Sequence, residues 1–234
     1  MLKVKNKKEN VLLSILIVVY NDKFITKTID SIIPFLSAKV ELVIVDGKST
    51  DGTIDLILEY LPYIDIFLSE PDEGIYDAMN KAVNLASGKY VIHLNSGDFL
   101  LDLPLKYLEQ INDSFCGAAF PIKIDNDRSF FPKWNWKIHY KSVIHHQGIF
   151  YRKEYVNYDL KYKIFSDLCL NIRLYDKNKK FAIYNSPYIT NHLTNGVSCS
   201  GKYKKELYKL ILNESGLFYL VLYFLEKITK RYFI

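Results

Sequence analysis

Polar side chains, most of them acids or amides, follow each of four apolar segments in the first hundred residues. These positions are Tyr20 and Asn21, Asp46, Glu70 and Asp72, and the run from Asn95 to Asp98. Carboxylates at a nucleotide site can accept hydrogen bonds from a base N–H or from ribose hydroxyls. They can also hold a divalent cation that neutralises a diphosphate. For any single aspartate the alternative is a helix cap, and Asp51 before "IDLILEYL" fits that role.

The segment "VIVDGKSTDGT", residues 43–53, contains Gly-Lys-Ser-Thr, which also ends a phosphate-binding P-loop. A P-loop needs a glycine five positions before its Gly-Lys pair, because successive backbone N–H groups must wrap the phosphate. That position is Leu42, inside the apolar run "VELVIVD". The sequence therefore excludes a P-loop and predicts a buried strand that ends at Asp46, followed by a polar turn.

Strand and helix signals alternate from residue 11 to residue 100. Apolar runs predict strands at 12–20, 40–45, 64–69 and 90–95. Apolar residues between them recur at helical spacing, as in Ile25, Ile29 and Ile32, and predict helices. This alternation is typical of an α/β fold with a mainly parallel sheet, which binds ligands beyond the carboxyl ends of its strands. No G-x-G-x-x-G follows the first strand, which argues against a dinucleotide site.

The composition indicates a globular chain. At 234 residues with 49% hydrophobic content, it can bury one substantial core. The net charge of +5 comes from 31 basic residues mixed with 26 acidic ones, which is not typical of a nucleic-acid-binding domain. The three cysteines lack metal-ligand spacing, so a reducing, cytoplasmic location is predicted.

The two ends of the sequence differ from its middle. Residues 1–10 predict a basic arm, and residues 201–234 predict basic amphipathic helices around the apolar run Gly216–Leu225. That run is too short to cross a membrane, which takes about 20 residues. Its basic flanks favour a helix that lies on an anionic membrane surface. The alternative is a helix that packs on the domain or on another subunit of a homo-oligomer.

Several motifs together resemble an inverting family 2 glycosyltransferase with a GT-A fold, a Rossmann-like nucleotide-diphospho-sugar transferase fold. They are "SILIVVYND", "VIVDGKSTDGT", "SEPDEGIYDAMNKAVNLASGKYVIHLNSGD" and "YKIFSDLCLNIRLY". The resemblance covers about residues 11–200 and is nearest to bacterial enzymes of O-antigen or capsule synthesis. It implies a nucleotide-sugar-binding part at 11–100 and an acceptor-binding and catalytic-base part at 101–200.

The resemblance also implies roles for single residues near the donor. Tyr20 and Asn21 would line the nucleotide pocket, and Asp46 would accept the base N–H. Asp72 would belong to the loop that closes over the base. Asn80 and Lys81, in "DAMNKA", would lie near the donor.

The segment "NSGD" stands at the family's D-x-D position, where the resemblance implies that Asp98 binds Mn²⁺ or Mg²⁺ beside the diphosphate. Asn95, Ser96 and Gly97 occupy positions where an earlier acid is usual. A single carboxylate is therefore expected to hold the metal, together with the diphosphate and water.

The general base implied by the resemblance is Asp167, in "FSDLCLNIRL". The alternative is that Ser166 or Asp167 caps the helix that begins there. His146 and Gln147, followed by Arg152, match a His-Gln pattern of the family. The resemblance implies that these three residues and Asn95 bind substrate, and His146 is expected to face the acceptor or the diphosphate. His145 is predicted to be structural or exposed, and His192 is more consistent with a structural residue than with a metal ligand.

The predicted function is therefore transfer of a sugar from a nucleotide donor, a UDP-sugar first, to a lipid-linked saccharide acceptor at the inner face of the cell membrane. Two alternatives stay open. A nucleotidyltransferase would need a glycine-rich, basic loop after the first strand, and "YNDKFITK" offers none. An inactive glycosyltransferase-like binding module would fit the altered "NSGD", whereas Asp98 and Asp167 argue against it.

Overall fold

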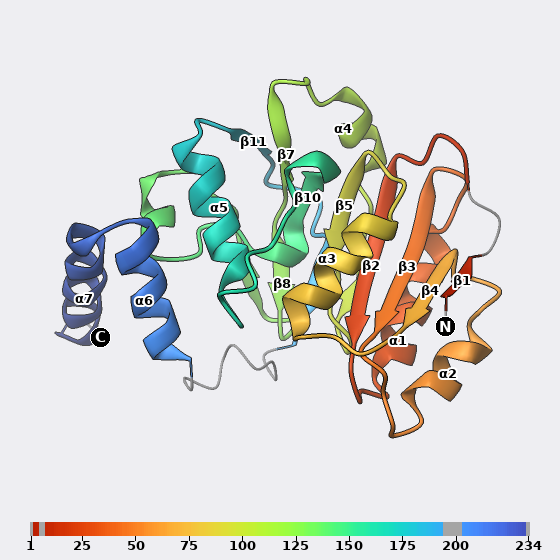
Figure 1. Cartoon of the computed structure of the whole chain (residues 1–234). Helices are drawn as coiled ribbons and strands as arrows, with labels where there is room; N and C mark the ends of the chain where they lie inside the picture. The colour runs from red at the N-terminus through yellow and green to blue at the C-terminus, as the bar shows by residue number, and fades with distance from the viewer. Residues whose placement is uncertain (1, 5–7, 194–202, 233–234) are drawn as a thin grey trace.

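An eight-stranded mixed sheet forms the centre of the molecule in a computed structural model that describes residues 2–4, 8–193 and 203–232 (Figure 1). Its strands, in spatial order, are β1 (Leu2–Val4), β4 (Ile66–Ser69), β3 (Val40–Asp46), β2 (Leu13–Val19), β5 (Tyr90–His93), β10 (Ile149–Arg152), β7 (Phe115–Ala119) and β11 (Lys180–Ile183). A second, four-stranded sheet contains β6 (Phe99–Leu100), β12 (Thr190–His192), β8 (Ile122–Ile124) and β9 (Arg128–Phe130).

The half of the main sheet formed by β4, β3, β2 and β5 is parallel, as the sequence predicts. All seven residues of β3 are buried, which explains its continuous apolar run. Beyond β5 the direction changes, because β10 is antiparallel to both β5 and β7. The prediction of an α/β fold with a parallel core is confirmed, and the added strands make the whole sheet mixed.

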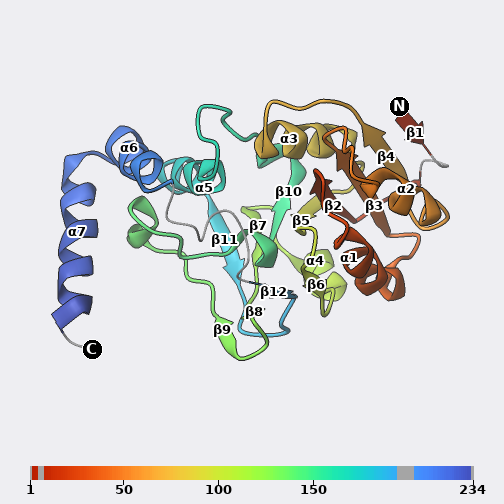
Figure 2. The ribbon, with the colours of Figure 1, turned by 90° about the horizontal axis from the view of Figure 1, so that it is seen from below.

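Helices cover both faces of the sheet. They are α1 (Ile25–Ile32), α2 (Thr53–Glu59), α3 (Ile75–Leu85), α4 (Leu105–Gln110) and α5 (Ser166–Asp176), with short 3-10 turns η1 (Ile33–Phe35), η2 (Trp136–His139), η3 (His146–Gly148) and η4 (Lys153–Tyr155). Figure 2 shows α3 and α1 on opposite sides of the strands. Leu13, Ile15 and Ile17 of β2 share a core cluster with α1, whereas Leu16 packs in the cluster of α3. Alternate residues of a strand thus anchor the two layers that flank the site.

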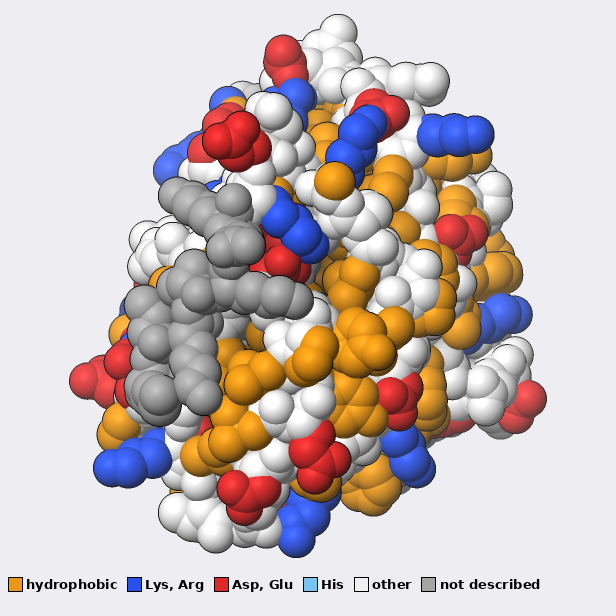
Figure 3. All heavy atoms as spheres, turned by 90° about the vertical axis from the view of Figure 1, so that its right-hand side faces the viewer, with side chains coloured by type: hydrophobic (Ala, Val, Ile, Leu, Met, Phe, Trp, Pro, Cys, Tyr) orange, Lys and Arg blue, Asp and Glu red, His pale blue; other side chains and the backbone are white. Residues whose placement is uncertain are grey.

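The N-terminal residues attach to the edge of the main sheet. Residues 2–4, predicted as part of a basic arm, form β1 and pair antiparallel with β4 at the edge of the sheet. The Lys8 ammonium lies 2.9 Å from the Asp65 carboxylate and continues this attachment. Figure 3 faces this side of the molecule, where acidic and basic side chains are interspersed among hydrophobic ones.

Two helices follow the last described strand. α6 (Lys204–Glu214) buries Leu210 against Ile138 and Leu168, and Arg173 of α5 lies 2.9 Å from the Glu214 carboxylate. α7 (Leu217–Tyr232) lies at the end of the molecule opposite β1 and leaves apolar side chains exposed (Figure 1). Within the described ranges, every helix is too short or too polar to cross a membrane.

Candidate active site

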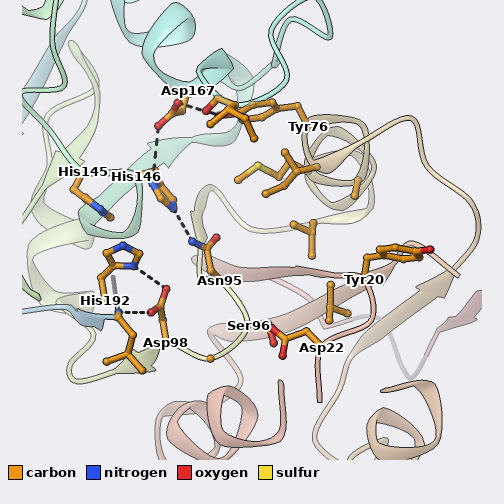
Figure 4. A pocket seen from close by; sticks show the side chains of 18 of the residues that line it. Tyr20, Asp22, Tyr76, Asn95, Ser96, Asp98, His145, His146, Asp167 and His192 are labelled. Carbon is orange, nitrogen blue, oxygen red and sulfur yellow. Dashed lines mark hydrogen bonds and ion pairs between the residues drawn. The ribbon is translucent and has the colours of Figure 1, made fainter. Parts of the chain in front are cut away.

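A pocket of about 840 Å³ opens where the parallel strands end (Figure 4). One side, here the nucleotide half, is lined by residues after β2 and around the start of α3, including Tyr20, Asp72 and Tyr76. The other side, here the catalytic half, contains His145, His146, Asp167 and His192. The segment from Asn95 to Asp98 lies between the two halves. The structure therefore brings two of the four predicted strand-end acids, Asp72 and Asp98, together with the predicted base, to one cavity.

Tyr20 and Asp72 meet at the rim of the nucleotide half. The Tyr20 ring is 62% exposed, so its face is available to a base. A Cβ atom at Gly47 would clash with the Asp72 carboxylate and crowd the Tyr20 ring. Glycine at this position in "DGKST" therefore allows the two side chains to approach the end of β3. In the segment that resembles a P-loop, the glycine therefore leaves room for two pocket side chains.

Asn21 and Asp46 are not among the residues that line the pocket. Asp46 is fully buried and accepts hydrogen bonds from the Ser49 backbone N–H, the Ser49 hydroxyl and the Ser69 hydroxyl. The Asn21 side chain accepts from the Thr50 N–H at 2.8 Å. These bonds shape the turn after β3. The direct nucleotide contacts predicted for the two residues stay predictions.

Three further residues that are predicted to contact substrate form bonds within the protein. Asn80 is paired with the backbone of Tyr158, donating to its carbonyl at 2.9 Å and accepting from its N–H at 2.8 Å. Lys81 forms ion pairs with Glu70 and Asp77. Arg152 is buried and donates to the Phe115 carbonyl and the Asp113 carboxylate. Each holds the fold around the site and lies outside the pocket lining.

Asp98 is a buried carboxylate at the centre of a hydrogen-bond network. Its Oδ2 accepts from the Gln147 amide at 2.5 Å and contacts His192 Nδ1 at 3.0 Å. Its Oδ1 accepts from the Leu193 N–H at 2.7 Å. Because a carboxylate can only accept, Nδ1 carries the proton of His192. Asp98 thus joins the turn after β5 to η3 and β12, and Gln147 supports it from behind the pocket.

The predicted metal site was tested against this arrangement. Both Asp98 oxygens already accept from protein donors, and the described residues contain no group of three or more His, Cys, Asp or Glu that could hold a metal ion. Divalent magnesium and manganese prefer several oxygen ligands. The described side chains around Asp98 do not form a divalent-cation site by themselves. That Asp98 holds a metal together with the diphosphate and water stays a prediction.

Asp167 lies in the first turn of α5 and points into the catalytic half (Figure 4). Its Oδ1 accepts from the Tyr76 hydroxyl at 3.0 Å, and its Oδ2 lies 3.9 Å from His146 Nδ1. Neither Asp167 nor Ser166 caps the helix by a side-chain hydrogen bond. The N–H groups of Ile164 and Phe165 donate instead to Glu206 of α6. The capping alternative for Asp167 is therefore not found.

His146 connects Asp167 to the turn after β5. The Asn95 amide is 3.2 Å from His146 Nε2 and donates to it, which leaves the proton on Nδ1, facing Asp167. Burial lowers the pKa of His146, and the charges of Asp167 and Asp98 offset part of this shift. At neutral pH the ring is therefore neutral, and its Nδ1 faces Asp167 without a hydrogen bond.

Sequence reasoning missed His145, His192 and Tyr76 as pocket residues. The His145 ring stacks on His146 at 4.7 Å between centroids and lies 5.0 Å from His192. Burial lowers the pKa of His145 well below its usual value. The doubled histidine was a visible signal for His145. Tyr76 had a weaker one, its place in the first helical turn after a strand-end loop.

The sequence model described as glycosyl transferase family 2 matches residues 14–179. The chain belongs to this family. The match includes both halves of the pocket except His192 and its neighbours, and so includes Asp98, His146 and Asp167.

Other members of the family support this placement. A PGL/p-HBAD biosynthesis glycosyltransferase of Mycobacterium bovis is 32% identical over 163 residues, 63% of this chain and 62% of the relative. The matched region thus spans about three fifths of that relative's length.

Among solved structures, S. aureus TarS 1-349 in complex with UDP-GlcNAc superposes with a TM-score of 0.69 at 21% identity, covering 87% of this chain and 66% of TarS 1-349. The mannosyltransferase PcManGT from Pyrobaculum calidifontis, in complex with GDP-Man and Mn²⁺, has a TM-score of 0.65 at 14% identity and covers 90% and 65%. These likenesses establish the GT-A fold of this family 2 chain.

Proposed function

We propose that the chain is an inverting glycosyltransferase that moves a sugar from a nucleoside diphosphate donor, a UDP-sugar first, to a hydroxyl of a saccharide acceptor. One observation carries the proposal. The Asp167 carboxylate shares a single pocket with the polar residues that follow β2, β4 and β5. A base and a nucleotide-sized cavity at the strand ends are the two parts that such a transfer needs.

In this mechanism the nucleotide lies in the nucleotide half, with its base against the exposed Tyr20 ring. The diphosphate and sugar extend past Asn95 toward His146. The acceptor hydroxyl attacks the anomeric carbon from the face opposite the diphosphate, through an oxocarbenium-like transition state. Asp167 takes the hydroxyl proton as the new bond forms. The bond between the sugar and the diphosphate breaks in the same step.

Asp167 is suited to this task because of how its two oxygens are held. Oδ1 is fixed by Tyr76, while Oδ2 lies 3.9 Å from His146, beyond ordinary hydrogen-bond reach. Oδ2 is therefore the oxygen that can accept the incoming proton. The neutral His146 ring beside it does not compete for that proton, since its pKa is lowered by burial.

A donor panel tests this function. Binding of UDP-, GDP- and dTDP-sugars is measured by calorimetry with Mn²⁺, with Mg²⁺ and with excess chelator. We expect saturable binding of a UDP-sugar. Proton NMR of the transfer product should show an anomeric configuration opposite to that of the donor. A retained configuration would contradict the inverting mechanism, and binding without any transfer would favour an inactive binding module.

We further propose that the acceptor is lipid-linked, in bacterial surface polysaccharide synthesis, and that α7 holds the protein on the inner face of the cell membrane. Leu217, Val221 and Leu225 are exposed at four-residue spacing on α7, with Phe224 and Ile228 beside them. Exposed lysines of α6 lie in the adjoining helix, namely Lys204, Lys205 and Lys209. An apolar stripe next to cations fits an interfacial helix on anionic lipid.

Liposome sedimentation tests the membrane proposal. Removing residues 203–234 would also remove Leu210 from the core, so substitutions are preferable to truncation. Val221→Asp combined with Leu225→Asp should release the protein from vesicles that contain phosphatidylserine. Ile183→Asp, an exposed apolar residue on β11, is the matched control and should leave binding unchanged. Equal sedimentation of both variants would contradict the proposal, and loss of a dimer on gel filtration would assign α7 to a homo-oligomer.

A further inference from the structure

Tyr76 joins the two halves of the pocket through its hydroxyl. It lies in the first turn of α3, and its buried ring packs against Tyr158 with 5.2 Å between centroids. The hydroxyl oxygen is 3.0 Å from Asp167 Oδ1 and 2.7 Å from the Ile164 carbonyl oxygen. Figure 4 shows the ring directed from α3 toward Asp167.

This hydroxyl has one proton and two neighbours that can only accept. A carboxylate and a backbone carbonyl both lack a proton to donate, so the hydroxyl donates to one of them at a time. The ionised carboxylate is the stronger acceptor. Once the carboxyl group has been protonated, that advantage is lost and the carbonyl of Ile164 becomes the better acceptor.

We propose that Tyr76 is a positioning residue for the base, donating its hydrogen bond to Asp167 before sugar transfer and to the Ile164 carbonyl after Asp167 has taken the acceptor proton. The inference rests on the proposed role of Asp167 and deepens it. No proton leaves Tyr76 in this exchange. The acceptor proton moves to Asp167, the acceptor oxygen bonds to the anomeric carbon, and the electron pair of the broken bond leaves with the diphosphate.

The surroundings of Asp167 support this assignment. Burial and the Asp167 charge raise the pKa of Tyr76 well above its usual value, so Tyr76 keeps its proton at neutral pH. From η3, the neutral His146 faces Asp167 at 3.9 Å. Tyr158 and Tyr151 lie near it, and burial raises the pKa of both. Glu206 is bonded to the backbone ahead of α5.

Within the described ranges, Tyr76 is the side chain that hydrogen bonds to Asp167. The two-acceptor geometry also keeps the buried hydroxyl satisfied in both protonation states of the base. Without Ile164, protonation of Asp167 would weaken the only bond of a buried donor, which costs free energy. The Ile164 carbonyl therefore lowers the free-energy cost of protonating Asp167.

The test is Tyr76→Phe, which keeps the ring packing and removes only the hydroxyl. The assay is release of UDP from the UDP-sugar that the wild type turns over fastest in the donor panel. We expect kcat/KM to fall about 10- to 100-fold, as for a hydrogen bond to a charged group. The acidic limb of the kcat/KM pH profile should move to higher pH, because a bond that favours the ionised carboxylate is gone. Donor affinity measured by calorimetry should stay within about twofold.

Tyr162→Phe is the matched control. Tyr162 is also buried and bonds through its hydroxyl to Glu214, away from Asp167. The Tyr162→Phe variant should have the same kcat/KM pH profile as the wild type. If Tyr76→Phe lowers the rate without moving the acidic limb, Tyr76 is only a structural link between α3 and the loop before α5, and the inference fails.

Asp167→Asn separates this inference from the proposed function. Full turnover in Asp167→Asn would overturn the role of the base itself. Loss of turnover in Asp167→Asn, together with a normal rate and profile in Tyr76→Phe, would overturn the Tyr76 proposal alone. In the double variant, Tyr76→Phe should add little to the loss from Asp167→Asn, since the two residues act as a unit.

Discussion

The nucleotide half of the pocket takes its side chains from the turns after β2 and β4 and from the start of α3, whereas the catalytic half takes them from η3, α5 and β12. The Tyr20 ring in the nucleotide half is largely exposed. In the catalytic half, His192 is buried and bonded to Asp98. A substitution in the nucleotide half should therefore change donor binding with little effect on the free energy of unfolding. A substitution in or around the catalytic half should change activity and the free energy of unfolding together.

Asp98→Ala should show the largest combined effect. It leaves the Gln147 amide, His192 Nδ1 and the Leu193 N–H without their shared acceptor. We expect a loss of about 3 kcal/mol or more in the free energy of unfolding, measured with urea. Turnover should fall as well, because η3 carries His146. A variant with unchanged stability that loses only a Mn²⁺-dependent part of donor binding would restore the metal-ligand role.

His93, at the end of β5, should make the protein sensitive to acid. Its ring is buried without a hydrogen-bond partner among the described residues, and burial lowers its pKa to about 3. Below pH 6.5 this histidine binds a proton in the unfolded chain but not in the folded chain. The free energy of unfolding therefore decreases by about 1.4 kcal/mol for each unit by which the pH is lowered. When the pH is lowered from 7 to 5, His93→Leu should lose about 2 kcal/mol less of its free energy of unfolding than the wild type loses. Equal losses would contradict this.

Arg152→Met tests whether Arg152 supports the fold or binds substrate. The buried guanidinium donates to the Phe115 carbonyl and pairs with Asp113, and Arg152 is not among the residues that line the pocket. We expect the free energy of unfolding to drop by about 2 kcal/mol, with KM for donor and acceptor nearly unchanged. A rise in either KM at normal stability would return Arg152 to substrate binding.

Tyr20→Ala should show the smallest effect, confined to donor binding. Loss of a stacking face raises the donor KM about tenfold. The free energy of unfolding should change little, because the ring is mostly exposed. Tyr20→Phe should restore donor binding, whereas failure to restore it would point to the hydroxyl instead of the ring.

The parallel strands and their polar ends could be predicted because each is a local pattern. The buried run of β3 and the helical spacing in α1 need no knowledge of the rest of the chain. Asp46 shows the limit of such patterns. Its place at the end of a strand was correct, while its burial under Ser49 and Ser69 depends on side-chain packing that spacing does not encode.

The catalytic half could be predicted only through family resemblance. Tyr76 and Asp167 meet across 91 positions, and Asp98 meets Leu193 across 95. No periodicity links such distant residues. A motif also names residues without saying which side of an element faces the ligand, and Asn80, Lys81 and Arg152 form their bonds within the protein.

Asp167→Asn, assayed with the best donor of the panel, tests the central claim most directly. The amide keeps the shape of the side chain and loses the proton acceptor, so turnover should fall about 10²- to 10⁴-fold while donor affinity by calorimetry stays nearly intact. The Tyr76 hydroxyl can still donate to the amide oxygen of Asn, and the wild-type carboxylate caps no helix, so the fold should persist. Near-normal turnover on the acceptor would contradict the account.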